Sequence, residues 1–210
     1  MRPLPRLHAI TDRDVLARGD FAARARAIAA AGAAVALHAR DRSASGARLA
    51  AVTGELLDLA GPLEAAVFVN ARADVAVALG AQGLHLGQGD LSPRDIRAAF
   101  GSRWRGAIGV SVHSTREADL ALEDGADYLM VGTIYETPSH PGRAGAGLSL
   151  VRELATRGAP VIAIGGITAG RARVVREAGA YGVAAIRALW AADDPGAAAM
   201  ELLAPWLEAA

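Results

Sequence analysis

Histidine is the residue type in this sequence best suited to moving protons. The five histidines are His8, His38, His85, His113 and His140. Imidazole titrates near neutral pH even in unperturbed surroundings, so it can serve as a general acid or base. None of the five lies in a segment expected to be helical, and their spacing matches no metal-binding motif. We predict chemical roles for His38 and His113, whereas His8 and His85 are more readily explained as hydrogen-bonded core residues.

A glycine pair, Gly165-Gly166, follows the apolar run 161–164 and precedes an expected helix. The backbone N–H groups of such a turn, together with the positive end of the helix, can bind a phosphate. Arg187, just after the expected strand at 182–186, could reach the same phosphate. We therefore predict a phosphate site formed by Gly165, Gly166, Ile186 and Arg187. A tight turn that binds no ligand is the alternative.

Two further segments carry polar groups after expected strands. Arg40 and Arg42 flank Asp41, and arginine binds phosphate or carboxylate through paired hydrogen bonds. The segment 132–145 is long and contains hydroxyls, a histidine, an arginine and several glycines, which is typical of a binding loop or lid. The alternatives are a solvated charged loop for the first segment and a disordered surface loop for the second.

Composition excludes several classes of function. Acidic and basic residues balance at 22 each and aromatic residues make up 4%, which argues against a nucleic-acid partner. The absence of cysteine excludes disulfides and thiolate metal sites, and the absence of lysine excludes Schiff-base chemistry. No apolar run is long enough for a membrane span or a signal peptide. We expect a soluble, cytoplasmic protein with no membrane partner.

Short apolar runs alternate with alanine-rich helical stretches along the whole chain, and these elements must position the groups above. Eight such pairs predict a single-domain (β/α)₈ TIM barrel over residues 1–210, with an open doubly wound sheet as the alternative. The expected strands are 7–11, 34–38, 66–70, 83–86, 107–111, 128–132, 161–165 and 182–186. The expected helices are 20–31, 46–59, 72–79, 93–100, 115–124, 148–157, 169–178 and 194–208. Ser114 to Glu117 reads as a capping box.

Several motifs together resemble the thiamine phosphate synthase and thiazole tautomerase family. The resemblance covers nearly the whole chain, from the His-Ala-Ile-Thr-Asp start at His8 to the Gly-Ala-x-Gly-Val segment at 179–183. Its most specific pieces are Val69-Asn70, 83–88, 109–114, 127–137 and 164–167. The resemblance implies a (β/α)₈ barrel, a phosphorylated thiazole ligand, a place in thiamin biosynthesis and a homodimer.

The family has two branches, and this sequence departs from the synthase pattern. The resemblance implies that a synthase has Gln-x-Arg-x-Lys after its second strand. This chain has His38-Ala39-Arg40-Asp41-Arg42 there. It also implies that a synthase has Asn-Asp after the third strand and a second Asp after the fourth, and that these two carboxylates hold Mg²⁺. This chain has Asn70-Ala71 at the first place, so one carboxylate is missing, and keeps Asp90 at the second. The resemblance also implies a lysine in the loop after the sixth strand, where this chain has His140, and a serine after the eighth strand, where this chain has Arg187. These departures favour the tautomerase branch.

We therefore expect a thiazole tautomerase, an isomerase that aromatises a thiazole carboxylate phosphate by a proton shift, with His113 as its catalytic acid and base. Besides the phosphate site, the expected substrate-binding residues are His38, Arg40, Arg42, Asn70, Ser111, Thr137, Ser139 and His140. No cofactor or metal is expected for this reaction.

Three alternatives remain open. The first is a thiamine phosphate synthase, which joins hydroxymethylpyrimidine diphosphate to thiazole phosphate with Mg²⁺ on Asp90. The second is a non-catalytic regulator that binds thiazole or thiamin phosphates. The third is a different phosphate-binding barrel isomerase.

Overall fold

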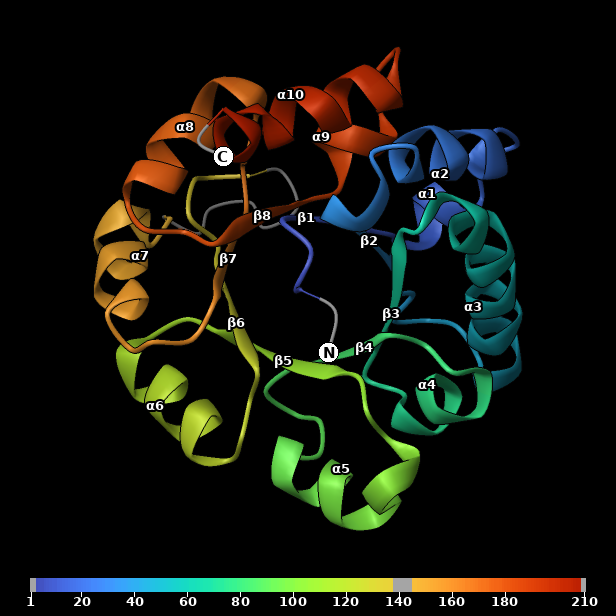
Figure 1. The fold of residues 1–210 in the computed structure, drawn as a ribbon, viewed down its shortest axis with the longest axis horizontal. Helices are drawn as coiled ribbons and strands as arrows, with labels where there is room; N and C mark the ends of the chain where they lie inside the picture. The colour runs from blue at the N-terminus through green and yellow to red at the C-terminus, as the bar shows by residue number, and fades with distance from the viewer. Residues whose placement is uncertain (1–2, 138–144, 209–210) are drawn as a thin grey trace.

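The chain forms a closed barrel of parallel strands, which the computed structural model describes for residues 3–137 and 145–208. Each strand pairs with its neighbours in chain order, and β8 pairs with β1 to close the ring (Figure 1). The strands are β1 (Leu7–Ile10), β2 (Val35–Ala39), β3 (Ala66–Asn70), β4 (Gly83–Leu86), β5 (Ala107–Val112), β6 (Tyr128–Val131), β7 (Val161–Ile164) and β8 (Gly182–Ala185). This ring confirms the predicted (β/α)₈ barrel against the open sheet.

Helices surround the strands on the outside of the ring (Figure 1). They are α1 (Arg13–Leu16), α2 (Phe21–Ala29), α3 (Gly46–Ala60), α4 (Ala73–Leu79), α5 (Pro93–Phe100), α6 (Thr115–Glu123), α7 (Gly147–Ala155), α8 (Ala169–Glu177), α9 (Arg187–Trp190) and α10 (Pro195–Leu207). Single 3₁₀ turns at Gly32–Ala34, Gly61–Leu63 and Gly101–Arg103 lead into the next strand or its loop. Among the described residues, none of these helices is long and apolar enough to cross a membrane.

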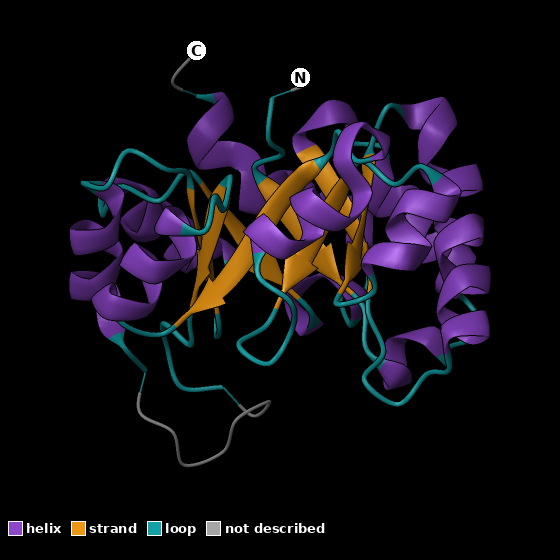
Figure 2. Cartoon of the chain, turned by 90° about the horizontal axis from the view of Figure 1, so that it is seen from below, coloured by secondary structure: helices purple, strands orange, loops and turns teal. Residues whose placement is uncertain are grey.

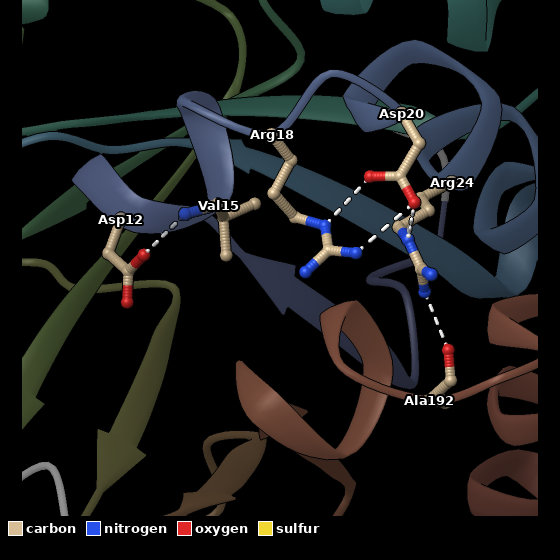
Figure 3. Close-up of polar contacts among 6 residues, drawn as sticks. All are labelled: Asp12, Val15, Arg18, Asp20, Arg24 and Ala192. Carbon is tan, nitrogen blue, oxygen red and sulfur yellow. Dashed lines mark hydrogen bonds and ion pairs between the residues drawn. The ribbon is translucent and has the colours of Figure 1, made fainter.

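Two short helices that the sequence pattern does not predict follow the first and last strands. Asp12 begins α1 by accepting a hydrogen bond from Val15 N at 2.9 Å (Figure 3). The other, α9, starts at Arg187, just after β8. Four residues are too few to display an apolar repeat of helical period, so these helices are invisible to a periodicity argument.

Apolar residues form a core on each face of the strands. Successive side chains of a strand point to opposite faces, so alternate positions face the interior of the barrel. The inner core consists of Ile10, Ala36, Phe68, Tyr128, Met130, Ile162 and Ala184. The larger outer core packs the strands against the helices. Gly83 and Gly109 make room for the rings of Phe68 and Tyr128, because a Cβ at either glycine would overlap the ring.

An arginine–aspartate cluster links the first and last parts of the ring. Asp20, just before α2, accepts hydrogen bonds from Arg18 at 2.8 Å and from Arg24 at 2.6 Å (Figure 3). Arg24 also donates to Ala192 O at 2.6 Å, just after α9. Since α2 packs against α10 as well, these contacts hold the first helices of the ring against the last ones.

The two ends of the barrel have different tasks. In the side view of Figure 2 the described chain begins and ends at the same end of the barrel, which is the upper end in that view. The strands run away from that end, so the segments that follow their carboxyl ends gather at the opposite one. Barrels of this architecture carry their chemistry at the carboxyl ends of the strands.

Candidate active site

The carboxyl ends of the strands bring most of the predicted ligand-binding residues to one rim. We call this rim the mouth and define it by Arg40 after β2, Asn70 at the end of β3, Ser111 near the end of β5, Gly165 after β7 and Arg187 after β8. The predicted residues Ser139 and His140 lie outside the described residues.

Three histidines lie together inside the barrel, beneath the mouth. His8, His38 and His85 share the strand faces of the inner core and are at most 3% exposed. The ring centroids of His8 and His38 are 5.1 Å apart, and those of His38 and His85 are 6.0 Å apart. Desolvation lowers the pKa of His38 to about 4 and that of His85 to about 3, and it holds the pKa of His8 well below its usual value. All three rings are therefore neutral at pH 7.

One hydrogen-bonded chain runs from the base of β1 to the mouth. His8 Nε2 lies 3.1 Å from Pro5 O, and His8 Nδ1 lies 2.8 Å from His38 Nε2. His38 Nδ1 in turn lies 2.9 Å from the side-chain amide of Asn70. His38 was predicted to bind substrate, but the structure places its buried ring between His8 and Asn70, so Asn70 is the member of this chain that reaches the mouth.

A second chain runs from Tyr128 to the mouth through His85. The Tyr128 hydroxyl lies 3.1 Å from His85 Nδ1, and His85 Nε2 lies 2.8 Å from Ser111 Oγ. Burial raises the pKa of Tyr128 well above its usual value, so this hydroxyl keeps its hydrogen. When it donates that hydrogen to His85 Nδ1, the other ring nitrogen donates to Ser111, whose own hydrogen is then free to point toward a ligand.

His113 lies on the rim, just after β5, and it is exposed rather than buried. Its Nδ1 and its backbone N both lie near Glu117 Oε2, at 3.1 Å and 2.7 Å. Since a carboxylate accepts, Nδ1 carries the hydrogen and Nε2 is left for solvent or a ligand. The predicted capping box is therefore only half formed, because Ser114 accepts from Glu117 N while the Glu117 carboxylate turns to His113.

Two arginines at the end of β2 form a cationic corner of the mouth. Arg40 is half-buried and Arg42 is exposed. Burial, and then the neighbouring Arg42, lower the pKa of Arg40 from its usual value, while Asp12 and Asp41 act in the opposite direction. In the part of the chain that the structure describes, no carboxylate forms an ion pair with Arg40. A half-buried guanidinium without such a partner suits an anionic ligand.

Thr11 fixes the backbone beneath this corner. Its hydroxyl, wholly buried, lies 2.8 Å from His38 O and 2.9 Å from both Arg40 N and Arg40 O. These contacts tie the end of β1 to the start of the loop after β2. Thr11 thereby positions Arg40.

The glycine turn after β7 has the geometry predicted for it. Gly165 and Gly166 have φ values of 99° and 62°, which side chains rarely adopt. A Cβ on Gly165 would lie 2.7 Å from Thr133 Cγ2, so the two loops approach closely. Helix α8 begins just beyond, at Ala169, with its positive end near this turn. Arg187 donates to Thr137 Oγ1 at 3.2 Å, which brings the loop after β6 to the same part of the mouth.

The mouth offers few ligands for a metal. Within residues 3–137 and 145–208 no group of three histidine or acidic side chains could hold an ion. Asp90 is exposed after β4, where its Oδ2 accepts from Gly87 N at 2.7 Å. Ala71 stands at the position of the missing carboxylate, with φ at 65°. One carboxylate is compatible with Mg²⁺ only where the bound substrate supplies phosphate oxygens.

Two hollows lie at the opposite end of the barrel and contain none of these groups. One, of about 640 Å³, lies where β3, β4 and β5 begin, beside Leu4 and Trp104. The other, of about 580 Å³, lies near the starts of β7 and β8, beside Tyr181 and Trp206. Neither hollow is lined by a residue that defines the mouth.

Five residues support the predicted site residues through hydrogen bonds without themselves being predicted to bind a ligand. They are Thr11 and Tyr128, which lie within the recognised motifs, His8 and His85, which are buried and hydrogen-bonded as expected of core residues, and Glu117, which belongs to the expected capping box. Strand alternation could have revealed His8, because it shares a face with Ile10, as His38 does with Ala36.

Comparison with known sequences shows which proteins this chain is similar to. The sequence model of one family, described as thiamine monophosphate synthase, matches residues 7–189. A thiamine-phosphate synthase of Thermus thermophilus is 47% identical over 137 residues, and the match covers 64% of this chain and 65% of that protein, just under two thirds of its length. A thiamine-phosphate synthase of Mycobacterium sp. strain JLS is 42% identical over 198 residues, covering 88% of this chain and 85% of that protein.

The fold comparison agrees with these sequence matches. The structure of thiamine phosphate pyrophosphorylase from Pyrococcus furiosus has a TM-score of 0.82 and 30% sequence identity, over 97% of this chain and 96% of that one. All three relatives carry synthase or pyrophosphorylase names. The prediction of a thiazole tautomerase, and with it of an isomerase, is therefore wrong. The missing carboxylate at Ala71 and the absence of lysine are outweighed by the similarity to synthases along the chain.

Proposed function

Because the chain belongs to the thiamine monophosphate synthase family, we propose that it is a thiamine-phosphate synthase, a transferase that joins a pyrimidine diphosphate to a thiazole phosphate. The observation that carries this proposal is that one mouth holds two separate groups of residues suited to bind anions. One is the arginine corner after β2, and the other is the glycine turn after β7. Strands β1 and β8 lie between them, so two phosphorylated substrates would have separate places in the same site.

The arginine corner would bind the diphosphate. Arg40 is half-buried and forms no ion pair within the described residues, and Arg42 adds a second cation beside it. The two guanidinium groups would stabilise the negative charge on the departing diphosphate. Because they are already in place, little rearrangement of the protein would be needed during the reaction. Arginine serves this purpose without lysine, because its N–H groups bind phosphate oxygens in pairs.

The glycine turn would bind the phosphate of the thiazole. The left-handed backbone at Gly165 and Gly166 lets N–H groups approach an anion closely, and the start of α8 adds a partial positive charge. Ile186 precedes Arg187 at the start of α9, and Arg187 brings a cation from the neighbouring strand end. Thr137, which accepts from Arg187, closes this end of the mouth.

Magnesium would accompany the diphosphate rather than reside in a protein cage. Asp90 would supply one oxygen ligand, and the diphosphate would supply others. When bound, the ion would neutralise part of the charge that develops on the leaving diphosphate. Asn70 and Ser111 would orient the substrates from the ends of β3 and β5. The role of His113 as acid and base belonged to the tautomerase hypothesis and is not part of this function.

A coupling assay tests this proposal directly. The purified chain is incubated with hydroxymethylpyrimidine diphosphate, thiazole phosphate and Mg²⁺, and both thiamin phosphate and released diphosphate are measured. We expect equal amounts of the two products, and none when either substrate is omitted. A parallel incubation with the thiazole carboxylate phosphate tautomer should show no aromatisation. Aromatisation without coupling would overturn the proposal.

Two coarser expectations accompany this function. The protein is proposed to act in the cytoplasm on phosphorylated small molecules, and it is proposed to be a homodimer. Light scattering after gel filtration tests the second point, since a monomeric mass of 21.4 kDa at assay concentration would contradict it.

A further inference from the structure

The chain of hydrogen bonds from Pro5 to Asn70 raises a counting problem. Pro5 O can only accept, and in the structure the Asn70 atom that faces His38 is Oδ1, which also only accepts. Between these two acceptors lie His8 and His38, joined by a third contact at 2.8 Å. Three contacts need three hydrogens on ring nitrogens, whereas two neutral imidazoles carry two in total.

Two arrangements can satisfy all three contacts. In one, an imidazole takes up an extra proton and the pair becomes cationic. In the other, the Asn70 amide is turned by 180°, which exchanges Nδ2 and Oδ1 without moving the rest of the group. Nδ2 then donates to His38 Nδ1, His38 Nε2 donates to His8 Nδ1, and His8 Nε2 donates to Pro5 O.

The surroundings of the pair favour the neutral arrangement. Both rings are wholly buried. The charged or titratable groups beside them are Arg40 and His85 near His38, and His85 and Tyr128 near His8. Within the described residues no carboxylate bonds to either ring. A buried cation without a carboxylate is costly, whereas turning an amide costs little and leaves every donor and acceptor satisfied.

We propose that His8 and His38 are positioning residues that hold the Asn70 amide with Nδ2 toward His38, so that Asn70 presents its Oδ1 to the mouth. Asn70 is half-buried at the end of β3, and its outward atom is the one that a ligand meets. An outward Oδ1 accepts a hydrogen bond from an amino or hydroxyl group of a ligand and disfavours a phosphate oxygen. This consequence for substrate choice rests on the proposed function, whereas the direction of the hydrogen bonds does not.

The positions of the ring hydrogens can be measured in the unmodified protein. Long-range ¹H–¹⁵N correlation spectra of the ¹⁵N-labelled full chain at pH 7.5 distinguish protonated from unprotonated ring nitrogens for each histidine. We expect His8 and His38 both to be neutral, with the hydrogen on Nε2. A hydrogen on Nδ1 of His38, or an imidazolium at either residue, would overturn the proposal.

An isosteric variant tests whether Asn70 sets this pattern. In Asn70→Asp the carboxylate can only accept, so His38 should gain a hydrogen on Nδ1, as the other tautomer or as an imidazolium. The matched control is Gln88→Glu, at an amide whose Nε2 donates to Ser111 O at 2.6 Å and which, among the described residues, forms no hydrogen bond with His8, His38 or Asn70. This control should leave the His38 spectrum unchanged. An unchanged His38 spectrum in Asn70→Asp would contradict the proposal.

The wild-type spectrum decides the matter if Asn70→Asp does not fold. The coupling assay is a separate measurement, so the two proposals can fail independently. A protein that shows the expected histidine tautomers but no coupling would refute the proposed function and leave the role of His8 and His38 standing.

Discussion

Single side chains at the mouth fall into two groups, those that would meet a ligand and those that hold them in place. Arg40 belongs to the first group, because its half-buried guanidinium forms no ion pair among the described residues. Thr11 belongs to the second, because its buried hydroxyl contacts the backbone of Arg40. His38 also belongs to the second, since its ring nitrogens are taken by His8 and Asn70.

Removal of the Arg40 guanidinium should impair coupling. Hydrogen bonds to a charged group contribute about 1.5–3 kcal/mol, so Arg40→Ala should lower kcat/KM by roughly 10- to 100-fold. Arg40→Lys should recover only part of this, because an ammonium lacks the paired N–H groups. The matched control is Arg48→Ala, an exposed arginine on α3, which should retain full activity. Equal rates for Arg40→Ala and wild type would remove Arg40 from the site.

Substitution of His113 should have little effect on coupling. A general acid or base contributes about 10²- to 10⁴-fold, so His113→Asn would lose at least about 100-fold if this residue moved a proton in the reaction. We expect the coupling rate to stay within about twofold of wild type, because the proposed reaction uses arginines and backbone groups instead. Steady-state coupling rates across pH 6–9 check this, and a large loss would return His113 to a catalytic role.

At the scale of elements, the loops after β6 and β7 are positioned by each other. Ile134 N donates to Ile164 O at 2.9 Å, and Tyr135 N donates to Gly165 O at 3.1 Å. Arg171 in α8 extends this contact, because it donates to Gly166 O at 2.7 Å and lies over the Tyr135 ring. The proposed phosphate site is therefore built from two loops and the start of a helix rather than from one motif.

A methyl group at Gly165 should disturb this arrangement. Its φ of 99° is strained for alanine, and the added Cβ would lie 2.7 Å from Thr133. We expect Gly165→Ala to lower the free energy of unfolding by about 1–3 kcal/mol and to raise KM for thiazole phosphate. Urea unfolding and initial-rate kinetics measure the two effects.

Gly54→Ala in α3 provides the matched control for that substitution. A Cβ at Gly54 meets nothing within 4 Å, and its backbone is helical. Replacing a glycine in a helix interior by alanine should raise the free energy of unfolding by about 0.5–1 kcal/mol. The two variants should therefore shift stability in opposite directions, and a stabilised Gly165→Ala would contradict the close approach of the two loops.

For the molecule as a whole, the buried histidines link stability to pH. Burial lowers the pKa of His38 from 6.5 to about 4, so between these values the unfolded chain binds a proton that the folded chain does not. Stability should therefore fall as the pH falls from 6.5 toward 4, by about 3 kcal/mol for His38. Urea unfolding at half-unit pH intervals gives this profile.

Two histidine variants separate this effect from the titration of carboxylates. His38→Gln keeps a hydrogen-bonding side chain but does not titrate, so its profile between pH 6.5 and 4 should be flatter than that of wild type. His113→Gln makes the same chemical change at an exposed ring outside the buried cluster and serves as the matched control. Parallel profiles for wild type and His38→Gln would mean that His38 is not a buried neutral ring.

The sequence by itself determined the barrel and the outer parts of the site. Alternating apolar strands and amphipathic helices, closed by helix caps, lead to eight strand–helix units because local periodicity records which face of each element is buried. Glycines after β7 and arginines after β2 were recognisable for the same local reason. The sequence could not rank the two branches of the family correctly, because a few substitutions do not reveal whether neighbouring groups replace the lost charge.

Only the tertiary structure decided which polar groups meet. His8 and His38 are thirty positions apart, and their contact depends on the register that aligns Ile10 with His38 across β1 and β2. His85 and Tyr128 meet in the same way across the barrel interior. Hydrogen-bond partners and burial arise from packing between strands. His38 and His113 were equivalent candidates in the sequence, but packing makes His38 a buried support for the mouth and leaves His113 exposed on its rim.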